Sequence, residues 1–216
     1  GWMEGLPLQV SYFFDRTLRR KVQYHIIHLE PEHVICQLIR ASMYVRSLPF
    51  AKTLDYMDVF SEGMKQLARK YGILGFPFRW EAKRLSRFER SVYKDFDRHV
   101  IISLQDRDRL ALATAAQVAV IPNGVDESFQ PMPDQVKPNY EIVFVGNLGY
   151  GPNKEAASVL VKEILPELKR RGLQIRILLA GARPGRRVRS LDRTSGVTLK
   201  GWMEDIRLAY ADGRIF

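Results

Sequence analysis

The sequence contains a single cysteine, Cys36, and only four histidines among 216 residues. One cysteine cannot form a disulfide within the chain or make a thiolate metal site by itself, so a reducing compartment is expected. His25 and His28 lie three positions apart on a predicted helix. However, neither they nor His33 are accompanied by carboxylates at zinc-enzyme spacing. The sequence therefore predicts no metal site, and Cys36 is interpreted as part of a buried strand.

Long apolar runs are also missing. The longest, at 142–145 and 175–182, are far shorter than the roughly 20 residues needed to span a bilayer. Residues 1–14 carry Glu4 and no basic start, which is not the pattern of a secretory signal peptide. We therefore expect a cytoplasmic protein without a transmembrane helix.

The composition is that of a globular protein, with 46% hydrophobic and 27% charged residues, and it excludes disorder as the dominant state. Strand-like and helix-like segments alternate, which predicts an α/β fold with parallel sheets. In the first half, strands are expected at 34–38, 52–56, 99–104 and 118–122. The clearest helix is expected at 78–97, where one apolar stripe recurs at spacings of three and four: Leu85, Phe88, Val92 and Phe96.

A polar segment divides the sequence. Residues 124–139 contain Pro131, Pro133 and Pro138 without apolar periodicity, which indicates a linker between a domain at 1–123 and a second one at 140–216. In the second domain we expect strands at 141–145, 174–180, 197–200 and 214–216. Helices are expected at 153–171, closed by Gly172, and at 204–211.

The net charge is +10, from 34 Lys and Arg against 24 Asp and Glu. Basic residues form a stripe along the expected helix 78–97: Lys83, Arg87, Arg90, Lys94 and Arg98. One interpretation is a solvated face, partly offset by Glu81, Glu89 and Asp95; the other is contact with an anionic membrane surface. A nucleic-acid partner is not expected, because no binding motif or aromatic platform accompanies the charge. A second cluster is expected to attract phosphates: Arg183, Arg186, Arg187 and Arg189.

The segment from Phe144 to Asn153 runs from a strand through a glycine-rich turn into a helix. Glycines allow backbone amides to approach an anion, and the helix start adds unpaired N–H groups, so the segment can cradle a phosphate. Gly146, Gly149 and Gly151 do not match the spacing of the dinucleotide-binding fingerprint, and the segment lacks the Lys-Ser/Thr pair that completes a P-loop. Glycine used for packing alone remains the alternative.

Five motifs in order resemble group 1 retaining glycosyltransferases of GT-B fold, nearest to a bacterial branch that builds exopolysaccharide and other cell-envelope glycans. They are Ile121-Pro122-Asn123-Gly124-Val125-Asp126, the Phe144-Val145-Gly146 turn, Glu163-Ile164-Leu165-Pro166, Leu179-Ala180-Gly181, and Val197 to Asp205. The resemblance extends over the whole chain. It implies two Rossmann-like domains and a nucleotide-sugar co-substrate, UDP- or GDP-linked, without another cofactor.

The resemblance also implies residue roles. Asn123 and Gly124 would form the hinge. Gly146, with the amides of Asn147 and Leu148, would face the donor diphosphate. Lys154 is the lysine nearest to the position of the family's basic residue, because Asn147 stands where many members have arginine. Four residues would border the nucleobase: Gly181, Gly201, Trp202 and Met203.

The family's glutamate pair, which holds the donor ribose and sugar, would lie beyond Phe216, and the first strand of the acceptor domain is also not found. We therefore expect both domains to be incomplete and this chain alone to be inactive. A non-catalytic chain that binds a nucleotide or a partner remains the alternative. A nucleotide-sugar epimerase of the same fold is disfavoured, since the second half has no histidine.

The acceptor, a saccharide or a lipid-linked saccharide, would bind the amino-terminal domain, and the protein would then lie in the cytoplasm or at the inner face of the membrane. Asp55 and Asp58 flank the end of an expected strand, where open α/β sheets present ligands. Asp58 could instead cap the following helix. Arg40 could pair with an acidic acceptor or with a surface carboxylate.

Overall fold

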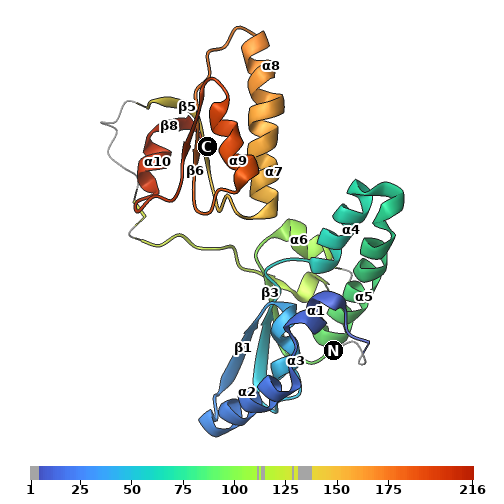
Figure 1. The fold of residues 1–216 in the computed structure, drawn as a ribbon. Helices are drawn as coiled ribbons and strands as arrows, with labels where there is room; N and C mark the ends of the chain where they lie inside the picture. The colour runs from blue at the N-terminus through green and yellow to red at the C-terminus, as the bar shows by residue number, and fades with distance from the viewer. Residues whose placement is uncertain (1–4, 111, 113–114, 128, 131–137) are drawn as a thin grey trace. The chain divides into compact units, whose positions relative to one another are not determined.

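The computed structural model describes residues 5–110, 112, 115–127, 129–130 and 138–216. The chain divides into two compact units, Gly1–Gly124 and Val125–Phe216. Each unit contains a four-stranded sheet in which every pair of neighbouring strands is parallel (Figure 1). The expected α/β fold with parallel sheets is confirmed.

The sheet of the amino-terminal unit has its strands in sequence order: β1 (His33–Gln37), β2 (Ala51–Asp55), β3 (Arg98–Ile101) and β4 (Ala119–Val120). The third strand is shorter than expected, because Ser103 begins a helix: its hydroxyl oxygen accepts a hydrogen bond from the backbone N–H of Asp106 at 3.1 Å.

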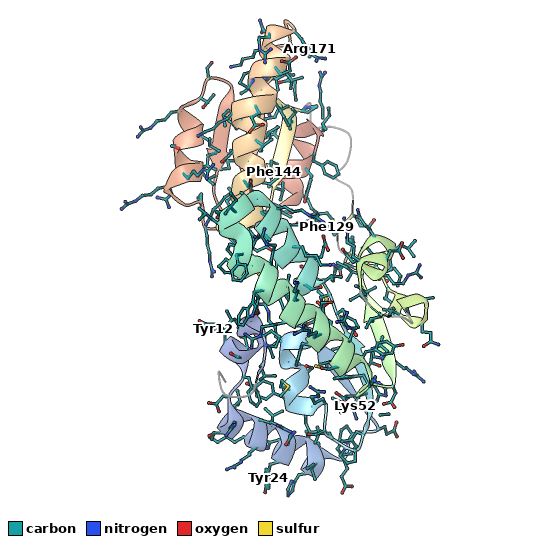
Figure 2. The ribbon with its side chains drawn as sticks, turned by 90° about the vertical axis from the view of Figure 1, so that its right-hand side faces the viewer. Tyr12, Tyr24, Lys52, Phe129, Phe144 and Arg171 are labelled. Atoms are coloured by element: carbon teal, nitrogen blue, oxygen red, sulfur yellow. The ribbon has the colours of Figure 1, made fainter. Side chains whose placement is uncertain are left out.

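Helices connect and cover these strands. They are α1 (Leu8–Phe13), α2 (Arg16–Leu29), η2 (Ile39–Ala41), α3 (Ser42–Val45), α4 (Phe60–Lys70), η3 (Gly72–Gly75), α5 (Phe76–Tyr93), α6 (Leu104–Arg109) and η4 (Ala115–Gln117). The aromatic rings of Tyr12 on α1 and Tyr24 on α2 are exposed (Figure 2). Helix α5 begins two residues earlier than expected, with Pro77 in its first turn, and ends at Tyr93 instead of residue 97. Lys94 and Arg98 therefore lie outside the helix, and the predicted basic stripe is shorter than expected.

The apolar stripe is confirmed on α5 for Leu85, Phe88 and Val92, which are buried in the core of this unit; Phe96 is buried there too but lies beyond the end of the helix. Lys52 on β2 is also buried (Figure 2). Its ammonium group donates hydrogen bonds to the carbonyl oxygens of Leu48 at 2.7 Å and Phe50 at 3.1 Å. These bonds offset the free-energy cost of burying the ammonium group.

The sheet of the carboxy-terminal unit has the order β7-β6-β5-β8. The strands are β5 (Tyr140–Val145), β6 (Ile177–Ala180), β7 (Val197–Lys200) and β8 (Gly213–Ile215). Strand β6 begins three residues later than expected, and all four of its side chains are buried, which makes it the centre of the core.

The helices of this unit are α7 (Gly151–Val159), η5 (Leu160–Ile164), α8 (Leu165–Arg170), α9 (Arg186–Arg189), η6 (Ser190–Arg193) and α10 (Arg207–Ala211). The first three are continuous and replace the single α-helix expected at 153–171. The middle one is a π-helical turn just before Pro166, which has no N–H to donate to the preceding turn. Gly172 follows with a positive φ of 79° and closes the helix as predicted. Helix α10 begins three residues later than expected.

Residues 124–127, 129–130 and 138–139 of the predicted linker form no helix or strand, and residues 131–137, with Pro131 and Pro133, lie outside the described residues. Asn123 and Gly124, the predicted hinge, are exposed, and a Cβ at Gly124 would meet no atom within 4 Å. Among the described helices, none is long and apolar enough to cross a membrane.

Candidate functional site

The carboxyl ends of β5, β6 and β7 meet at one edge of the carboxy-terminal sheet, and a glycine follows each strand. The Gly146 amide donates to the Ala180 carbonyl at 3.1 Å, and the Gly181 amide donates to the Gly201 carbonyl at 2.9 Å. The structure therefore brings together three glycines that the sequence assigned to donor binding. Such an edge is where open parallel sheets bind ligands.

Gly181 cannot be replaced without disturbing this edge. Its φ is +140°, and a Cβ atom there would lie 1.7 Å from the Gly146 carbonyl oxygen. Only a residue without a side chain allows the two strand ends to approach this closely.

The turn after β5 is held by the side chains of two asparagines. The Asn147 carboxamide oxygen accepts from the Gly149 amide at 3.0 Å, and the Asn153 side chain donates to the Asn147 carbonyl at 3.1 Å. A Cβ at Gly146 would lie 2.8 Å from the Asn153 side-chain nitrogen. The carboxamide side chain of Asn147 thus closes the turn through its oxygen atom, which explains why asparagine fits this position.

The expectation that the Leu148 amide faces a ligand is corrected. This amide donates to the Ala182 carbonyl at 2.8 Å, and the Leu148 side chain is fully buried in the core. The Asn147 amide, by contrast, makes no hydrogen bond with any described residue, and its residue is exposed. Asn147 is therefore the residue of this pair whose backbone N–H is available.

The amino terminus of α7 adds further donors. Gly151 and Asn153 lie in its first turn, where backbone N–H groups have no hydrogen-bond partner within the helix. Pro152, which lies between them, has no backbone N–H and therefore leaves no donor unpaired in this turn. The helix continues to Arg170, so its dipole directs partial positive charge toward this turn. The arrangement favours an anion.

Two cationic side chains lie beside the turn. Lys154 is in the first turn of α7, and its ammonium group makes no hydrogen bond or ion pair with the described residues; its Cε atom lies 4.0 Å from the position of a Cβ at Gly185. Arg183, with a positive φ of 56°, places its Cβ 3.0 Å from the position of a Cβ at Gly149. The loop that follows β6 thus packs against the turn that follows β5, and Arg183 lies where the two segments meet.

The remaining arginines of the predicted phosphate cluster follow this loop. Arg186, Arg187 and Arg189 are exposed, and Arg189 donates from Nε to the Pro184 carbonyl at 2.9 Å. That bond fixes Arg189 to the loop itself.

Two of the four residues predicted beside the nucleobase, Trp202 and Met203, differ in their surroundings. Trp202 is 72% exposed and can offer an aromatic face. Met203 is partly buried and packs against Val143, Leu178 and Ala180. Met203 therefore supports the sheet below the edge, whereas Trp202 is available to a ligand.

Of the acceptor-side candidates in the amino-terminal unit, Asp55 is the last residue of β2 and Asp58 lies in the turn that follows it. An Asp55 carboxylate oxygen accepts from the Met57 amide at 3.0 Å, and Met57 has a positive φ of 58°. Asp58 is exposed and accepts from the adjacent Val59 amide at 2.7 Å. Helix α4 has no side-chain cap, so the alternative that Asp58 caps this helix is not supported.

Arg40 is held between aromatic rings. Its guanidinium lies 4.1 Å from the centroid of Phe60 and 5.1 Å from that of Phe13, and it donates to the Gln9 side chain. These contacts are of the cation–π kind and position the side chain within its own unit.

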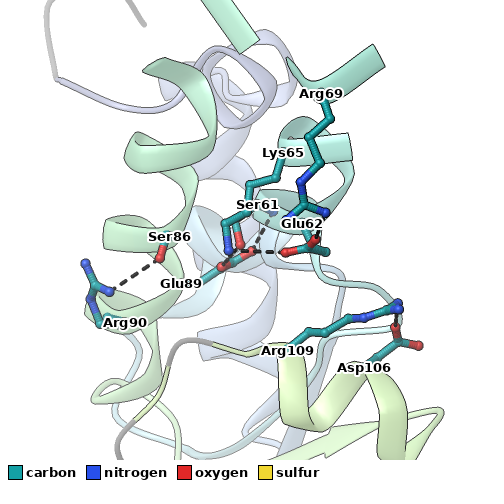
Figure 3. Close-up of polar contacts among 9 residues, drawn as sticks. All are labelled: Ser61, Glu62, Lys65, Arg69, Ser86, Glu89, Arg90, Asp106 and Arg109. Carbon is teal, nitrogen blue, oxygen red and sulfur yellow. Dashed lines mark hydrogen bonds and ion pairs between the residues drawn. The ribbon is translucent and has the colours of Figure 1, made fainter. Parts of the chain in front are cut away.

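The sequence treated Glu81 and Glu89 as surface charges, but both are buried. Glu89 on α5 accepts from the Ser61 amide at 3.0 Å and from the Ser61 hydroxyl at 2.7 Å, at the start of α4 (Figure 3). Burial raises the pKa of this carboxyl above its ordinary value. A signal was present: Glu81 and Glu89 lie four residues before and four residues after Leu85, on the face of the apolar stripe.

Among the described residues, no cluster of histidine, cysteine and carboxylate side chains could hold a metal ion. Cys36 is buried, and its burial raises the pKa of the thiol to about 12, which keeps it unreactive.

Residues 139–216 match a family model described as glycosyl transferases, group 1. No curated protein matches the chain. The match includes the whole glycine edge, Lys154 and Arg183, and it supports a glycosyl-transfer function for the carboxy-terminal unit. Together with the parallel α/β sheets, it is consistent with a Rossmann-like fold of GT-B type.

Proposed function

We propose that this protein transfers a sugar from a nucleotide-sugar donor to a saccharide or lipid-linked acceptor with retention of anomeric configuration, in cell-envelope or exopolysaccharide synthesis at the cytoplasmic side. The observation that carries the proposal is the glycine edge of β5, β6 and β7, with Lys154 and Arg183 near the turn into α7, inside the segment that matches the family model.

The proposed donor site acts mainly by electrostatics. As the glycosidic bond breaks, negative charge accumulates on the leaving diphosphate. The Asn147 amide, the first-turn amides of α7, the Lys154 ammonium group and the Arg183 guanidinium would stabilise that charge. Trp202 would stack on the nucleobase. Asp55 and Asp58 would accept hydrogen bonds from acceptor hydroxyls.

Replacing the two cations tests the donor site directly. We expect Lys154→Ala and Arg183→Ala each to raise the Kd for UDP or GDP, whichever binds, about tenfold, since each removes a charged contact to the diphosphate. Isothermal titration calorimetry measures this. Lys162→Ala and Arg193→Ala, which remove exposed cations of the same unit, serve as matched controls and should leave Kd unchanged.

Equal effects of all four substitutions would mean that only overall charge attracts the nucleotide, and would contradict the assigned site. No binding of either nucleoside diphosphate by the native protein would contradict the donor site itself.

A second candidate function is nucleotide binding without turnover. It is favoured by Asn147, whose side chain is occupied in closing the turn and brings no positive charge. Incubation with the nucleotide sugar that binds separates the two: release of free nucleoside diphosphate supports transfer, and binding without release supports the second candidate.

A further inference from the structure

Helices α4 and α5 form a hairpin (Figure 1). The turn between them exposes a group of apolar side chains. Ile73 is 92% exposed and Leu74 is 79% exposed. We name this group the apolar tip; its members are Tyr71, Ile73, Leu74, Phe76 and Trp80. Single exposed apolar residues are ordinary on protein surfaces, but a contiguous group at the end of a hairpin indicates a binding surface.

The tip has a fixed shape. Gly75 packs so closely on α4 that a Cβ there would lie 2.2 Å from the Ala68 carbonyl oxygen. The ring of Tyr71 stacks on that of Phe78 at 5.3 Å, and Arg79 donates to the Gly72 carbonyl at 3.2 Å. The apolar side chains are therefore presented by an ordered turn.

A basic groove of about 430 Å³ lies between α4 and α5, beside the apolar tip. Arg79 belongs to the lining of the groove and also donates to the Gly72 carbonyl, in the turn that carries the apolar tip. The two surfaces are therefore continuous. The groove is lined by five cations together with Ala82 and Ser86: Lys65, Arg79, Lys83, Arg87 and Arg90. The side chains of Lys83 and Arg87 form no ion pair or hydrogen bond with the described part of the chain, and Arg90 donates to the Ser86 hydroxyl at 3.4 Å (Figure 3).

From the combination of these surfaces we infer that the hairpin docks on an anionic lipid bilayer. The apolar tip enters the interface, and the basic groove binds the phosphate groups of the lipids. A bilayer surface requires both features at once, an apolar region for the boundary of the acyl chains and cations for the headgroups. An acidic protein would need the cations but would leave Ile73 and Leu74 without an apolar partner of their own.

The hairpin also extends toward the edge of the sheet that carries Asp55 and Asp58. Helix α5 has 18 residues, roughly 27 Å, and leads into the amino end of β3, whose 4 residues span only roughly 13 Å. Its amino end, with the tip, therefore projects beyond the carboxyl end of β3. Delivery of a lipid-linked acceptor to that edge rests on the proposed function; the membrane contact does not.

Co-sedimentation with vesicles tests the inference without any nucleotide. We expect the native protein to bind vesicles of phosphatidylcholine with phosphatidylglycerol and to bind phosphatidylcholine alone at least about tenfold more weakly. Both Ile73→Ser/Leu74→Ser and Lys83→Glu/Arg87→Glu should weaken binding to anionic vesicles about tenfold or more.

Matched controls separate the hairpin from general surface properties. Leu29→Ser/Ile215→Ser removes two apolar side chains that are 76% and 63% exposed, and Lys162→Glu/Arg193→Glu makes the same change of charge in the other unit. Both should bind as the native protein does. Equal losses in the controls, unchanged binding by the hairpin variants, or no vesicle binding by the native protein would each overturn the inference. Nucleotide titrations of the hairpin variants report on the donor site separately.

Discussion

Replacing Gly181 by valine is expected to destabilise the carboxy-terminal unit by about 3 kcal/mol and to abolish nucleotide binding. The backbone at this position has a φ of +140°, which L-residues rarely adopt. The Cβ atom of any side chain there would lie 1.7 Å from the Gly146 carbonyl oxygen. Because that oxygen is backbone, no side-chain rotation can relieve the contact. The carboxyl ends of β5 and β6 must then separate, which moves the turn that holds the proposed diphosphate site.

Urea unfolding followed by circular dichroism measures the loss of stability, and calorimetric titration measures the loss of binding. Gly201→Ala is the matched control. Gly201 follows the neighbouring strand β7, but a Cβ there meets no atom within 4 Å. This control should change the free energy of unfolding by less than about 0.5 kcal/mol. A Gly181→Val variant as stable as Gly201→Ala would show that the two strand ends do not approach as described.

Replacing Glu89 by alanine is expected to destabilise the amino-terminal unit by about 3 kcal/mol. The carboxylate is 1% exposed, and its two bonds to Ser61 join α5 to the start of α4. Without it, the buried Ser61 amide and hydroxyl lose their acceptor, and a cavity remains. Glu89→Gln, which keeps an acceptor oxygen and the volume, should cost much less. Denaturant unfolding of both variants measures the difference, and equal losses would contradict a role for these hydrogen bonds.

The same carboxyl gives a pH dependence of defined sign. Burial raises the pKa of Glu89 from its ordinary value of 4.5, so the folded protein binds a proton more readily than the unfolded chain. The native protein should therefore gain stability relative to Glu89→Gln as the pH falls through the raised pKa toward 4.5, and lose it again as the pH rises. Unfolding free energies of both proteins across that range measure this. A difference that does not vary with pH would contradict the raised pKa.

Much of the fold follows from local pattern. The apolar stripe of α5 required only periodicity, since residues three and four apart share one face of any helix. Strand β7 was predicted at its observed bounds, because Val197–Lys200 is a short apolar run between a glycine and a glycine-containing turn. Boundaries were wrong where one side chain or a proline decides them. Ser103 caps α6 where the strand at 99–104 was expected to continue, and Pro166 follows a π-helical turn within the predicted helix.

The sequence by itself determined the α/β alternation, the glycine turn into α7 and the place of Lys154 in the first turn of that helix, because these depend on neighbours along the chain. Tertiary structure decided which groups are available. Leu148 was named with Asn147, but its amide bonds to Ala182, 34 positions away in the sequence. Glu89 looked like a surface charge until α4 placed Ser61 against it. Arg183 reached Gly149 only through the pairing of β5 with β6. Contacts between distant segments determine burial and free hydrogen-bonding capacity, and no local pattern contains them.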